Sequence, residues 1–212
     1  NLRKKIIFSN NIIEAETAKV IENIQRDVNI GLINEIYLAC NKLNINFKNV
    51  NYLASTKWNF LNFDPGLVGG HCLPVDPYYF AYICKKNNFN TKITLAGRDI
   101  NDSMTKMIIN NIRGQIKSKK LEKKKILICG LTYKKDVSDL RNSLAFKIFQ
   151  ILKNKNVRGF DPLIDLKTAQ KNGILTKERE LRKFDIFIFL TKHEKIKKFL
   201  KKISNNKIIY PI

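Results

Sequence analysis

Ile126-Leu127-Ile128-Cys129-Gly130-Leu131 is an apolar run that begins directly after a lysine-rich tract, Lys117–Lys125. A short, continuous apolar run is typical of a strand buried on both faces of a parallel sheet. A second such run lies at Phe184–Leu190, and a shorter one at Val157–Phe160. The repetition of these runs predicts a sheet in the second half of the chain.

Helical patterns separate the predicted strands. Ser143–Lys153 is amphipathic, and a helix is expected near Asp165–Asn172. Strands that alternate with helices favour a doubly wound, Rossmann-like α/β domain. The lysine-rich tract looks like an exposed boundary near residue 120, so we assign residues 119–212 to this domain.

The first half, residues 1–118, is predicted to be a helical domain. Apolar residues recur at three- and four-residue spacing from Ile12 to Leu43 without an internal proline. A helix of that length spans about 45 Å, and long helices in small domains often form dimer interfaces, so a homodimer along it is expected. Shorter helices are predicted at Phe47–Ser55, Tyr78–Asn87 and Leu95–Ile116.

Composition narrows the class of protein. The 212 residues are 44% hydrophobic and have a net charge of +22, and no run approaches a membrane span. The first residues turn polar too early for a signal peptide, so a cytoplasmic protein is expected. The four cysteines form no CxxC pair, which argues against structural zinc or a disulfide scaffold. The lysines are scattered and match no nucleic-acid-binding motif, so specific nucleic-acid binding is not expected.

The loop Gly69-Gly70-His71-Cys72-Leu73-Pro74-Val75-Asp76 is the most informative segment for chemistry. Two glycines allow close approach of the backbone to a ligand and leave amides free for an oxyanion. Cys72 then lies four residues before Asp76, and a thiol beside a base or a positive field becomes a nucleophile. The alternative is that Cys72 is a small buried residue in a structural turn.

One face of the long helix presents Lys19, Asn23 and Arg26 at positions i, i+4 and i+7. A lysine and an amide could donate to a developing alkoxide, and Arg26 could hold a phosphate or carboxylate. The alternative is a solvated polar face on which Glu22 pairs with Arg26.

Helix and loop together resemble the carboxy-terminal half of the nucleotide-sugar 6-dehydrogenases, the UDP-glucose/GDP-mannose dehydrogenase superfamily. Within it, the chain looks most like the bacterial UDP-N-acetylhexosamine (UDP-GlcNAc/UDP-GalNAc) dehydrogenases of surface-polysaccharide synthesis. The matching stretches follow one another in family order: Ala15–Asn23, Asn34-Glu35, Thr56–Phe60, Pro65–Tyr79, Leu95–Asp102, Gly130–Asp136, Arg141-Asn142-Ser143 and Asp161-Pro162.

The resemblance implies a two-step, NAD-dependent oxidation of the sugar C6 alcohol to a carboxylate. By position, Cys72 would be the nucleophile that forms a thiohemiacetal and then a thioester. Lys19 and Asn23 would stabilise the oxyanion and orient water, and Asp76 would assist thioester hydrolysis. Each residue type suits the chemistry of its role.

The resemblance also implies a binding site for a UDP-N-acetylhexosamine. Arg26 and Gly69 would line it, Tyr133 and Lys134 would come from the second domain, and Arg141 is a weaker candidate. His71 and His193 receive no role from the resemblance; His71 is interpreted as structural and His193 as a core or surface residue.

Two departures from the family pattern bear on activity. No GxGxxG motif follows a strand, so the amino-terminal NAD-binding domain is expected to be absent. The chain begins with Asn, and its last residues, Lys207–Ile212, stop where a buried strand would end. Both ends therefore look cut, which favours a fragment that needs a separate NAD-binding half. The alternatives are a non-catalytic module that binds a UDP-sugar and dimerises, and the product of a decaying gene.

Overall fold

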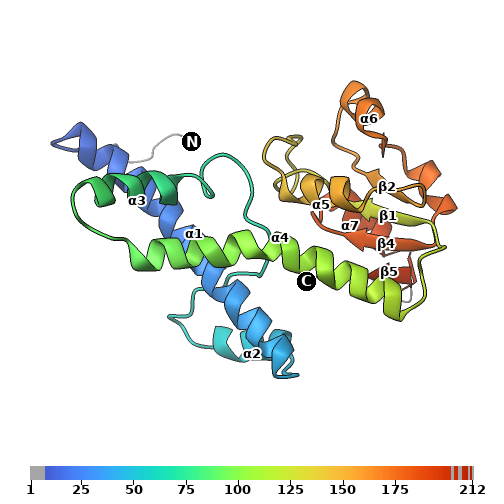
Figure 1. The fold of residues 1–212 in the computed structure, drawn as a ribbon, viewed down its shortest axis with the longest axis horizontal. Helices are drawn as coiled ribbons and strands as arrows, with labels where there is room; N and C mark the ends of the chain where they lie inside the picture. The colour runs from blue at the N-terminus through green and yellow to red at the C-terminus, as the bar shows by residue number, and fades with distance from the viewer. Residues whose placement is uncertain (1–7, 202, 205–206, 210, 212) are drawn as a thin grey trace.

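A computed structural model describes residues 8–201, 203–204, 207–209 and 211 of the chain. The described residues form a helical half and a half built on a parallel sheet, which the long helix α4 connects (Figure 1). The predicted fold class is therefore confirmed. The elements are α1 (Ile12–Lys42), α2 (Phe47–Ser55), α3 (Asp76–Lys86), α4 (Lys92–Ser118), β1 (Ile126–Cys129), α5 (Leu144–Leu152), β2 (Val157–Phe160), α6 (Leu166–Asn172), β3 (Ile174–Leu175), the 3₁₀ helix η1 (Glu178–Lys183), β4 (Ile186–Phe189), α7 (Glu194–Leu200) and β5 (Ile208–Ile209).

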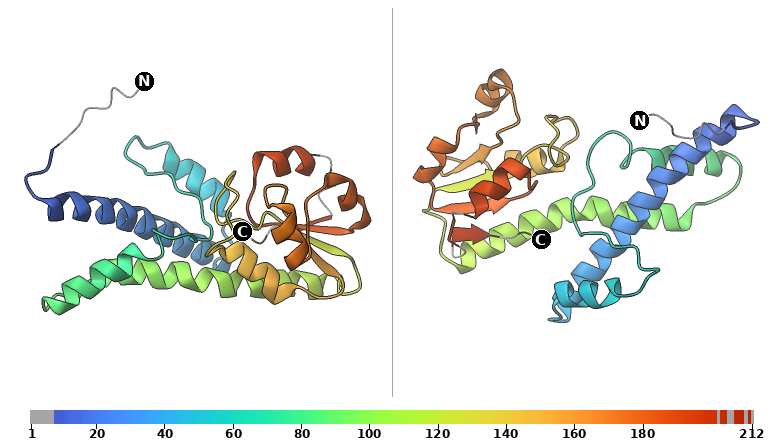
Figure 2. Two further views of the ribbon diagram at one scale, coloured as in Figure 1. Left: turned by 90° about the horizontal axis from the view of Figure 1, so that it is seen from above. Right: turned by 180° about the vertical axis from the view of Figure 1, so that it is seen from behind.

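In the helical half, α1 crosses α4 at very short range (Figure 2). The crossing depends on two glycines: a Cβ atom on Gly31 would lie 2.8 Å from the carbonyl oxygen of Gly97, and one on Gly97 would lie 3.1 Å from the Cα of Val28. Larger side chains would push the helices apart. Close contact of the two backbones follows, and it places polar residues of α1 against polar residues of α4.

These polar residues form a buried network at the crossing. Arg98 of α4 donates hydrogen bonds to Asp27 of α1 and, at 3.1 Å, to Asp102 one turn further along α4. Asn101 donates to Asp27 at 2.9 Å and, with Arg98 and Asp27, is fully buried. Removal from water raises the pKa of Asp27, although Arg98 partly opposes the shift. Ionic and amide contacts thus fix the register of the two helices.

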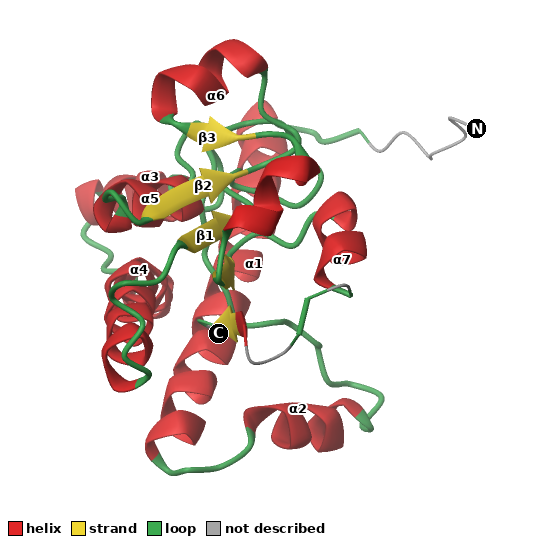
Figure 3. Cartoon of the chain, turned by 90° about the vertical axis from the view of Figure 1, so that its right-hand side faces the viewer, coloured by secondary structure: helices red, strands yellow, loops and turns green. Residues whose placement is uncertain are grey.

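The sheet half has five parallel strands in the order β3-β2-β1-β4-β5. The central strands are in direct register, with Ile128 of β1 opposite Gly159 of β2 and Ile188 of β4. Helices α4 and α5 cover one face, and α7 covers the other (Figure 3). Coverage on both faces explains why β1 and β4 are uniformly apolar.

Helix α4 belongs to both halves of the molecule. Its first turns contact α1 and α3, whereas Ile108, Ile109 and Ile112 share a core with Ile128 and Ile188 of the sheet. The helix ends at Ser118, next to the predicted boundary near residue 120. Division of the chain into domains 1–118 and 119–212 stays a prediction.

The structure adds three short elements that the sequence patterns did not predict: β3, η1 and α7. β3 has two residues, too few to show a period. β5, also of two residues, lies within the strand expected at Lys207–Ile212, of which Tyr210 and Ile212 fall outside the described residues. None of the helices that the structure describes is both long and apolar enough to cross a membrane.

Candidate functional site

The carboxyl ends of β1 and β4 form the switch point of the sheet. The chain leaves β1 toward α5 on one face and leaves β4 toward α7 on the other. In open α/β sheets, ligands bind outside the carboxyl ends of the strands at this point, because the two connections separate there. A cavity of about 1040 Å³ lies at this position, between the sheet half and the helical half.

Both halves line the cavity, and its walls are basic on the sheet side. Three residues that the resemblance assigned to substrate binding, Gly69, Tyr133 and Lys134, are among the lining residues. Further lining residues include Tyr37, Asn41, Phe47, Pro65, Gly66, Lys135, Thr191, Lys192 and Lys197. The volume and positive charge suit an anionic ligand of nucleotide size.

The glycine loop docks against the loop that follows β1. Gly70 has φ +97°, a left-handed conformation, and its N–H donates to the carbonyl oxygen of Asn142 at 3.2 Å. A Cβ atom at this position would lie 2.9 Å from Cδ2 of Tyr133. Glycine is therefore required at position 70 for the loop to reach the sheet half. The ring of His71 also meets that of Tyr133 edge-on, with 6.2 Å between centroids.

Cys72 is solvent-exposed, and it follows this docked segment directly. The alternative that Cys72 is a buried residue is therefore wrong. Its carbonyl oxygen accepts from the N–H of Val75 at 3.0 Å and of Asp76 at 2.9 Å. The resulting turn leads into α3, which starts at Asp76, so the thiol lies one turn before the acid.

Asn23 and Asp76 are in direct contact. The Nδ2 of Asn23, on α1, donates to Oδ2 of Asp76 at 2.6 Å, and Asn23 is almost fully buried. The two residues are 53 positions apart in sequence. Two of the predicted catalytic residues thus meet at the start of α3, beside the turn that contains Cys72.

Lys19 and Arg26 have a different partner. Both contact Glu22, which lies between them on α1; the Arg26 Nη2 to Glu22 Oε1 distance is 3.1 Å. The three side chains are exposed, and Lys19 lowers the pKa of Glu22 through a hydrogen bond and its charge. The polar face with a Glu22–Arg26 pair is therefore observed. In the described contacts, neither cation reaches the Asn23–Asp76 pair.

Arg141 binds a neighbouring carboxylate. Its guanidinium donates to both oxygens of Asp139, at 2.8 Å for the Nη2 bond. This contact lowers the pKa of Asp139 to about 2. The Arg141 side chain is 78% exposed and does not line the cavity.

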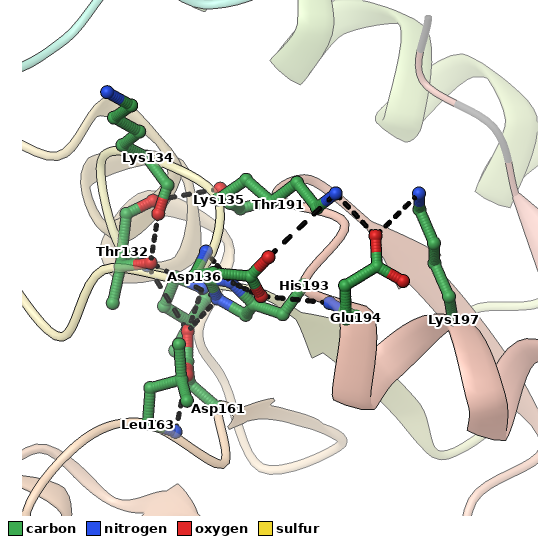
Figure 4. A network of polar contacts seen from close by, with 11 residues as sticks. Thr132, Lys134, Lys135, Asp136, Asp161, Leu163, Thr191, His193, Glu194 and Lys197 are labelled. Carbon is green, nitrogen blue, oxygen red and sulfur yellow. Dashed lines mark hydrogen bonds and ion pairs between the residues drawn. The ribbon is translucent and has the colours of Figure 1, made fainter. Parts of the chain in front are cut away.

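The two adjacent lysines after β1 differ in their contacts. Lys135 pairs with Glu194 at the start of α7, and the pair raises the pKa of Lys135 and lowers that of Glu194 to about 2. Lys134 extends away from this network (Figure 4). The geometry therefore favours Lys134 over Lys135 as the lysine available to an anionic ligand.

A buried cluster beneath the cavity was missed by the sequence reasoning as a functional feature. His193, Asp161 and Thr132 are fully buried at the carboxyl ends of β4, β2 and β1. His193 Nε2 lies 3.0 Å from Asp161 Oδ2 and 3.1 Å from Thr132 Oγ1. A signal existed, because each residue is polar and follows a strongly apolar strand at the same edge of the sheet.

The described residues do not fit the dinucleotide cofactor that the resemblance implies. The turn after β1 has a single glycine, Gly130, and a Cβ atom on it would lie 1.9 Å from the carbonyl oxygen of Thr191. The start of α5 is occupied as well, since the Ser143 side chain caps it and contacts the carbonyl oxygen of Leu131 at 2.5 Å. To bind a pyrophosphate, the turn after β1 and the amino-terminal end of α5 would both have to be accessible to the ligand.

Sequence comparisons match the chain to two profiles. Residues 13–103 match the profile described as UDP-glucose/GDP-mannose dehydrogenase family, central domain. Residues 127–212 match the profile described as the UDP binding domain of the same family.

Similar proteins include Protein CapL of Staphylococcus aureus, 42% identical over 85% of this chain and 44% of that protein. The UDP-N-acetyl-D-glucosamine 6-dehydrogenase of Pseudomonas aeruginosa is 41% identical over 73% of this chain and 38% of that enzyme. Among solved structures, the UDP-N-acetyl-mannosamine dehydrogenase of S. aureus is similar with a TM-score of 0.74 and 33% identity, over 93% of this chain and 46% of the other. The chain thus spans less than half the length of these relatives.

Proposed function

Because the chain belongs to the UDP-glucose/GDP-mannose dehydrogenase family, we propose that it provides the thiol- and substrate-bearing part of a UDP-N-acetylhexosamine 6-dehydrogenase. The relatives that support this substrate class are named as UDP-N-acetyl-D-glucosamine and UDP-N-acetyl-D-mannosamine dehydrogenases. The product would be the C6 carboxylate of the sugar, a precursor for surface polysaccharides.

The observation on which the proposal mainly rests is the hydrogen bond between Asn23 and Asp76. Folding brings together an amide and a carboxylate from distant stretches, one turn after an exposed thiol. The amide donor on Asp76 leaves its other oxygen, Oδ1, available to a water molecule. The arrangement suits hydrolysis of an acyl group on a cysteine.

In the proposed reaction, the thiolate of Cys72 adds to the C6 carbonyl of the aldehyde and forms the C–S bond of a thiohemiacetal. Lys19 would donate to the resulting oxyanion after its ammonium leaves Glu22, and Asn23 would donate beside it. At the thioester stage, Asp76 would accept a proton from the attacking water, and the C–S bond would break to return the Cys72 thiol.

The cavity at the switch point would hold the UDP group. Lys134 would contact the diphosphate, the Tyr133 ring and Gly69 would line the site, and Arg26 would approach from the helical half. Arg141 has a weaker claim, since Asp139 already occupies its guanidinium. Bound across the two halves, the UDP-sugar could extend from the cavity toward Cys72.

The hydride acceptor in this family is NAD. The described residues lack a fitting pyrophosphate cradle, so we place NAD on a dinucleotide-binding domain other than the two halves described. The thiohemiacetal becomes the thioester by loss of a hydride and a proton, and that hydride would pass to the acceptor on this other domain.

A homodimer through α1 is part of the proposal. Ile21 and Leu32 of this helix are 51% and 55% exposed, on a helix whose other side packs on α4. A second copy could bury these side chains. Wild type should then have the mass of two chains in light scattering, and Leu32→Glu should have the mass of one chain. An equal mass for wild type and variant would contradict a dimer at this face.

Alkylation of cysteine tests the substrate site without NAD. Iodoacetamide should modify exposed Cys72, and UDP-N-acetylglucosamine or UDP-N-acetylgalactosamine should slow that reaction at least tenfold. Partly exposed Cys84, measured in the same digest by mass spectrometry, is the internal control and should keep its rate.

Two variants show where the nucleotide binds. Lys134→Ala should abolish the protection of Cys72, while Lys147→Ala, which removes an exposed lysine from α5, should retain it. Protection that is absent in the folded wild-type chain, or equal in both variants, would contradict the proposed site.

A further inference from the structure

The loop between Thr132 and Asp136 contains Tyr133 and Lys134, the two residues proposed to contact the nucleotide. Its ends are tied to buried groups, whereas Lys134 itself projects from the network (Figure 4). The inference below rests on the proposed function, since it concerns how this loop is held over the cavity.

His193 is fully buried at the carboxyl end of β4 and contacts the loop at both ends. Its Nδ1 accepts a hydrogen bond from the backbone N–H of Asp136 at 2.9 Å. Since that bond requires a lone pair on Nδ1, the proton of the neutral ring is on Nε2. Nε2–H then points to Asp161 Oδ2 and Thr132 Oγ1, at 3.0 and 3.1 Å.

The carboxylate of Asp161 is held in a fixed position. It is fully buried, and its Oδ2 accepts from the N–H of Leu131 at 2.7 Å and of Thr132 at 3.3 Å. Its Oδ1 accepts from the N–H of Leu163 at 2.9 Å. These backbone donors hold the carboxylate in place with or without the imidazole, so Asp161 can orient the ring of His193.

Asp136 completes the far end of the loop. Its backbone is left-handed, with φ 58°, and its Oδ1 accepts from the N–H of Glu194 at 2.9 Å. At the near end, the Thr132 hydroxyl donates to the carbonyl oxygen of Lys134 at 3.1 Å. Both ends of the loop that contains Tyr133 and Lys134 are thus held by hydrogen bonds. The bond from the N–H of Asp136 to His193 holds the far end.

We propose that His193 is a positioning residue for nucleotide binding: oriented by Asp161, it anchors the backbone of Asp136 and thereby holds Tyr133 and Lys134 over the cavity. The role depends on Nδ1, which accepts the hydrogen bond from the N–H of Asp136. A side chain with an acceptor at the position of Nδ1 should therefore substitute for His193. A side chain that only donates to Asp161 should not.

The variants His193→Asn and His193→Gln separate these two contacts. Asn places its Oδ1 near the position of Nδ1 and can accept from Asp136, and Gln places its Nε2 near the position of the ring Nε2 and can donate to Asp161. His193→Phe removes both contacts at similar volume. Ile196→Ala is the stability control, because this buried residue of α7 packs in the hydrophobic core on the same face of the sheet and forms none of the hydrogen bonds that hold the loop.

Two readouts are needed: amide hydrogen exchange over residues 131–137 in the free 212-residue chain, and the affinity for UDP-N-acetylglucosamine by calorimetry. We expect His193→Phe and His193→Gln to speed exchange at Asp136 and to weaken binding at least tenfold. His193→Asn should keep both values within about threefold of wild type. Ile196→Ala should lower the melting temperature but keep the affinity.

The exchange data keep this inference distinct from the proposed function. Wild-type exchange in His193→Phe, or equal loss of affinity in His193→Asn and His193→Gln, would overturn the positioning role. Faster exchange with unchanged affinity would overturn it as well. If the wild-type chain binds no UDP-sugar, the proposed site fails, and the exchange pattern alone decides whether His193 anchors the loop.

Discussion

The side chain of Asn34 forms two hydrogen bonds with the backbone of Gly66. Its Nδ2 donates to the Gly66 carbonyl oxygen at 3.0 Å, and its Oδ1 accepts from the Gly66 N–H at 2.8 Å. This amide, fully buried on α1, thereby holds the start of the segment that leads through Gly69 to Cys72. A third bond, to Asn101 Oδ1 at 2.8 Å, fixes the amide itself. Position of the cavity wall thus depends on a residue outside the cavity.

Replacement of Asn34 with Ala should therefore lower stability. The change removes both bonds to the partly buried Gly66 and leaves the buried Oδ1 of Asn101 without its Asn34 donor, so the free energy of unfolding should fall by about 1–3 kcal/mol. Urea unfolding measures this loss, and cleavage by thermolysin before Leu67 or Val68 should accelerate. Gln25→Ala, an exposed change on the same helix, is the control. Equal stability of the two variants would show that the Asn34–Gly66 bonds contribute little.

Gly70→Ala should separate the glycine loop from the loop after β1. The left-handed φ of +97° is strained for alanine, and the new Cβ would press on the Tyr133 ring. We expect at least tenfold weaker binding of UDP-N-acetylglucosamine in calorimetry. Gly114→Ala in α4 has no atom within 4 Å of its new Cβ and should keep the affinity while raising helix stability slightly. Unaltered affinity in Gly70→Ala would mean that contact with Tyr133 does not position the loop.

Much of the fold could be predicted from periodicity. The apolar runs around Ile128 and Ile188 were long enough to identify buried strands, and the spacing from Ile12 onward gave the first helix almost to the residue. The expected segments Phe47–Ser55 and Val157–Phe160 match α2 and β2. β3 contains two residues, too few for a period to be visible, and α7 covers only about two turns.

The candidate site was predictable in its residue types but not in its contacts. Asn23 and Asp76 were chosen from separate motifs, and only the folded chain shows that they touch. Lys19 was assigned to an oxyanion, yet in the described contacts it pairs with Glu22. His193 was interpreted as a core or surface residue. Its hydrogen bonds with Asp161 and Asp136 join three strand ends, and no local pattern encodes such a long-range meeting.

Arg141→Ala should raise the pKa of Asp139. The side-chain bonds of Arg141 are the largest cause of the lowered value of about 2, followed by the backbone N–H of the same residue. The backbone bond persists in the alanine variant, so the pKa should settle between about 2 and the ordinary value of 3.8.

The contribution of Asp139 to stability follows from this lowered pKa. It is present above pH 3.8 and is lost as the pH falls toward 2. Carbon-detected NMR titration of the Asp139 carboxyl measures the pKa of wild type and variant. Because the Arg141 guanidinium already binds Asp139, Arg141→Ala should weaken UDP-N-acetylglucosamine binding less than Lys134→Ala does. A larger loss would indicate that Arg141 changes partners when the nucleotide binds.

Arg98→Met removes the cation from the buried network at the crossing of α1 and α4. Asp27 would keep its bond from Asn101 but lose the guanidinium, and an unpaired buried charge is costly. We expect the free energy of unfolding at neutral pH to fall by about 3–5 kcal/mol. The double variant Asp27→Leu/Arg98→Met, which leaves no unpaired charge at this place, should be more stable than Arg98→Met alone.

The loss in Arg98→Met should depend on pH in a defined direction. Burial already raises the pKa of Asp27 in the wild-type chain, and loss of Arg98 would raise it further because the attraction that opposes the shift is gone. A carboxyl with a raised folded-state pKa is most favourable to the fold when protonated, and its contribution is lost as the pH rises through that pKa. The stability gap between wild type and Arg98→Met should therefore be smaller at pH 5 than at pH 7.5 in urea unfolding. A gap that is constant, or larger at pH 5, would show that lost packing rather than the unpaired Asp27 charge explains the destabilisation.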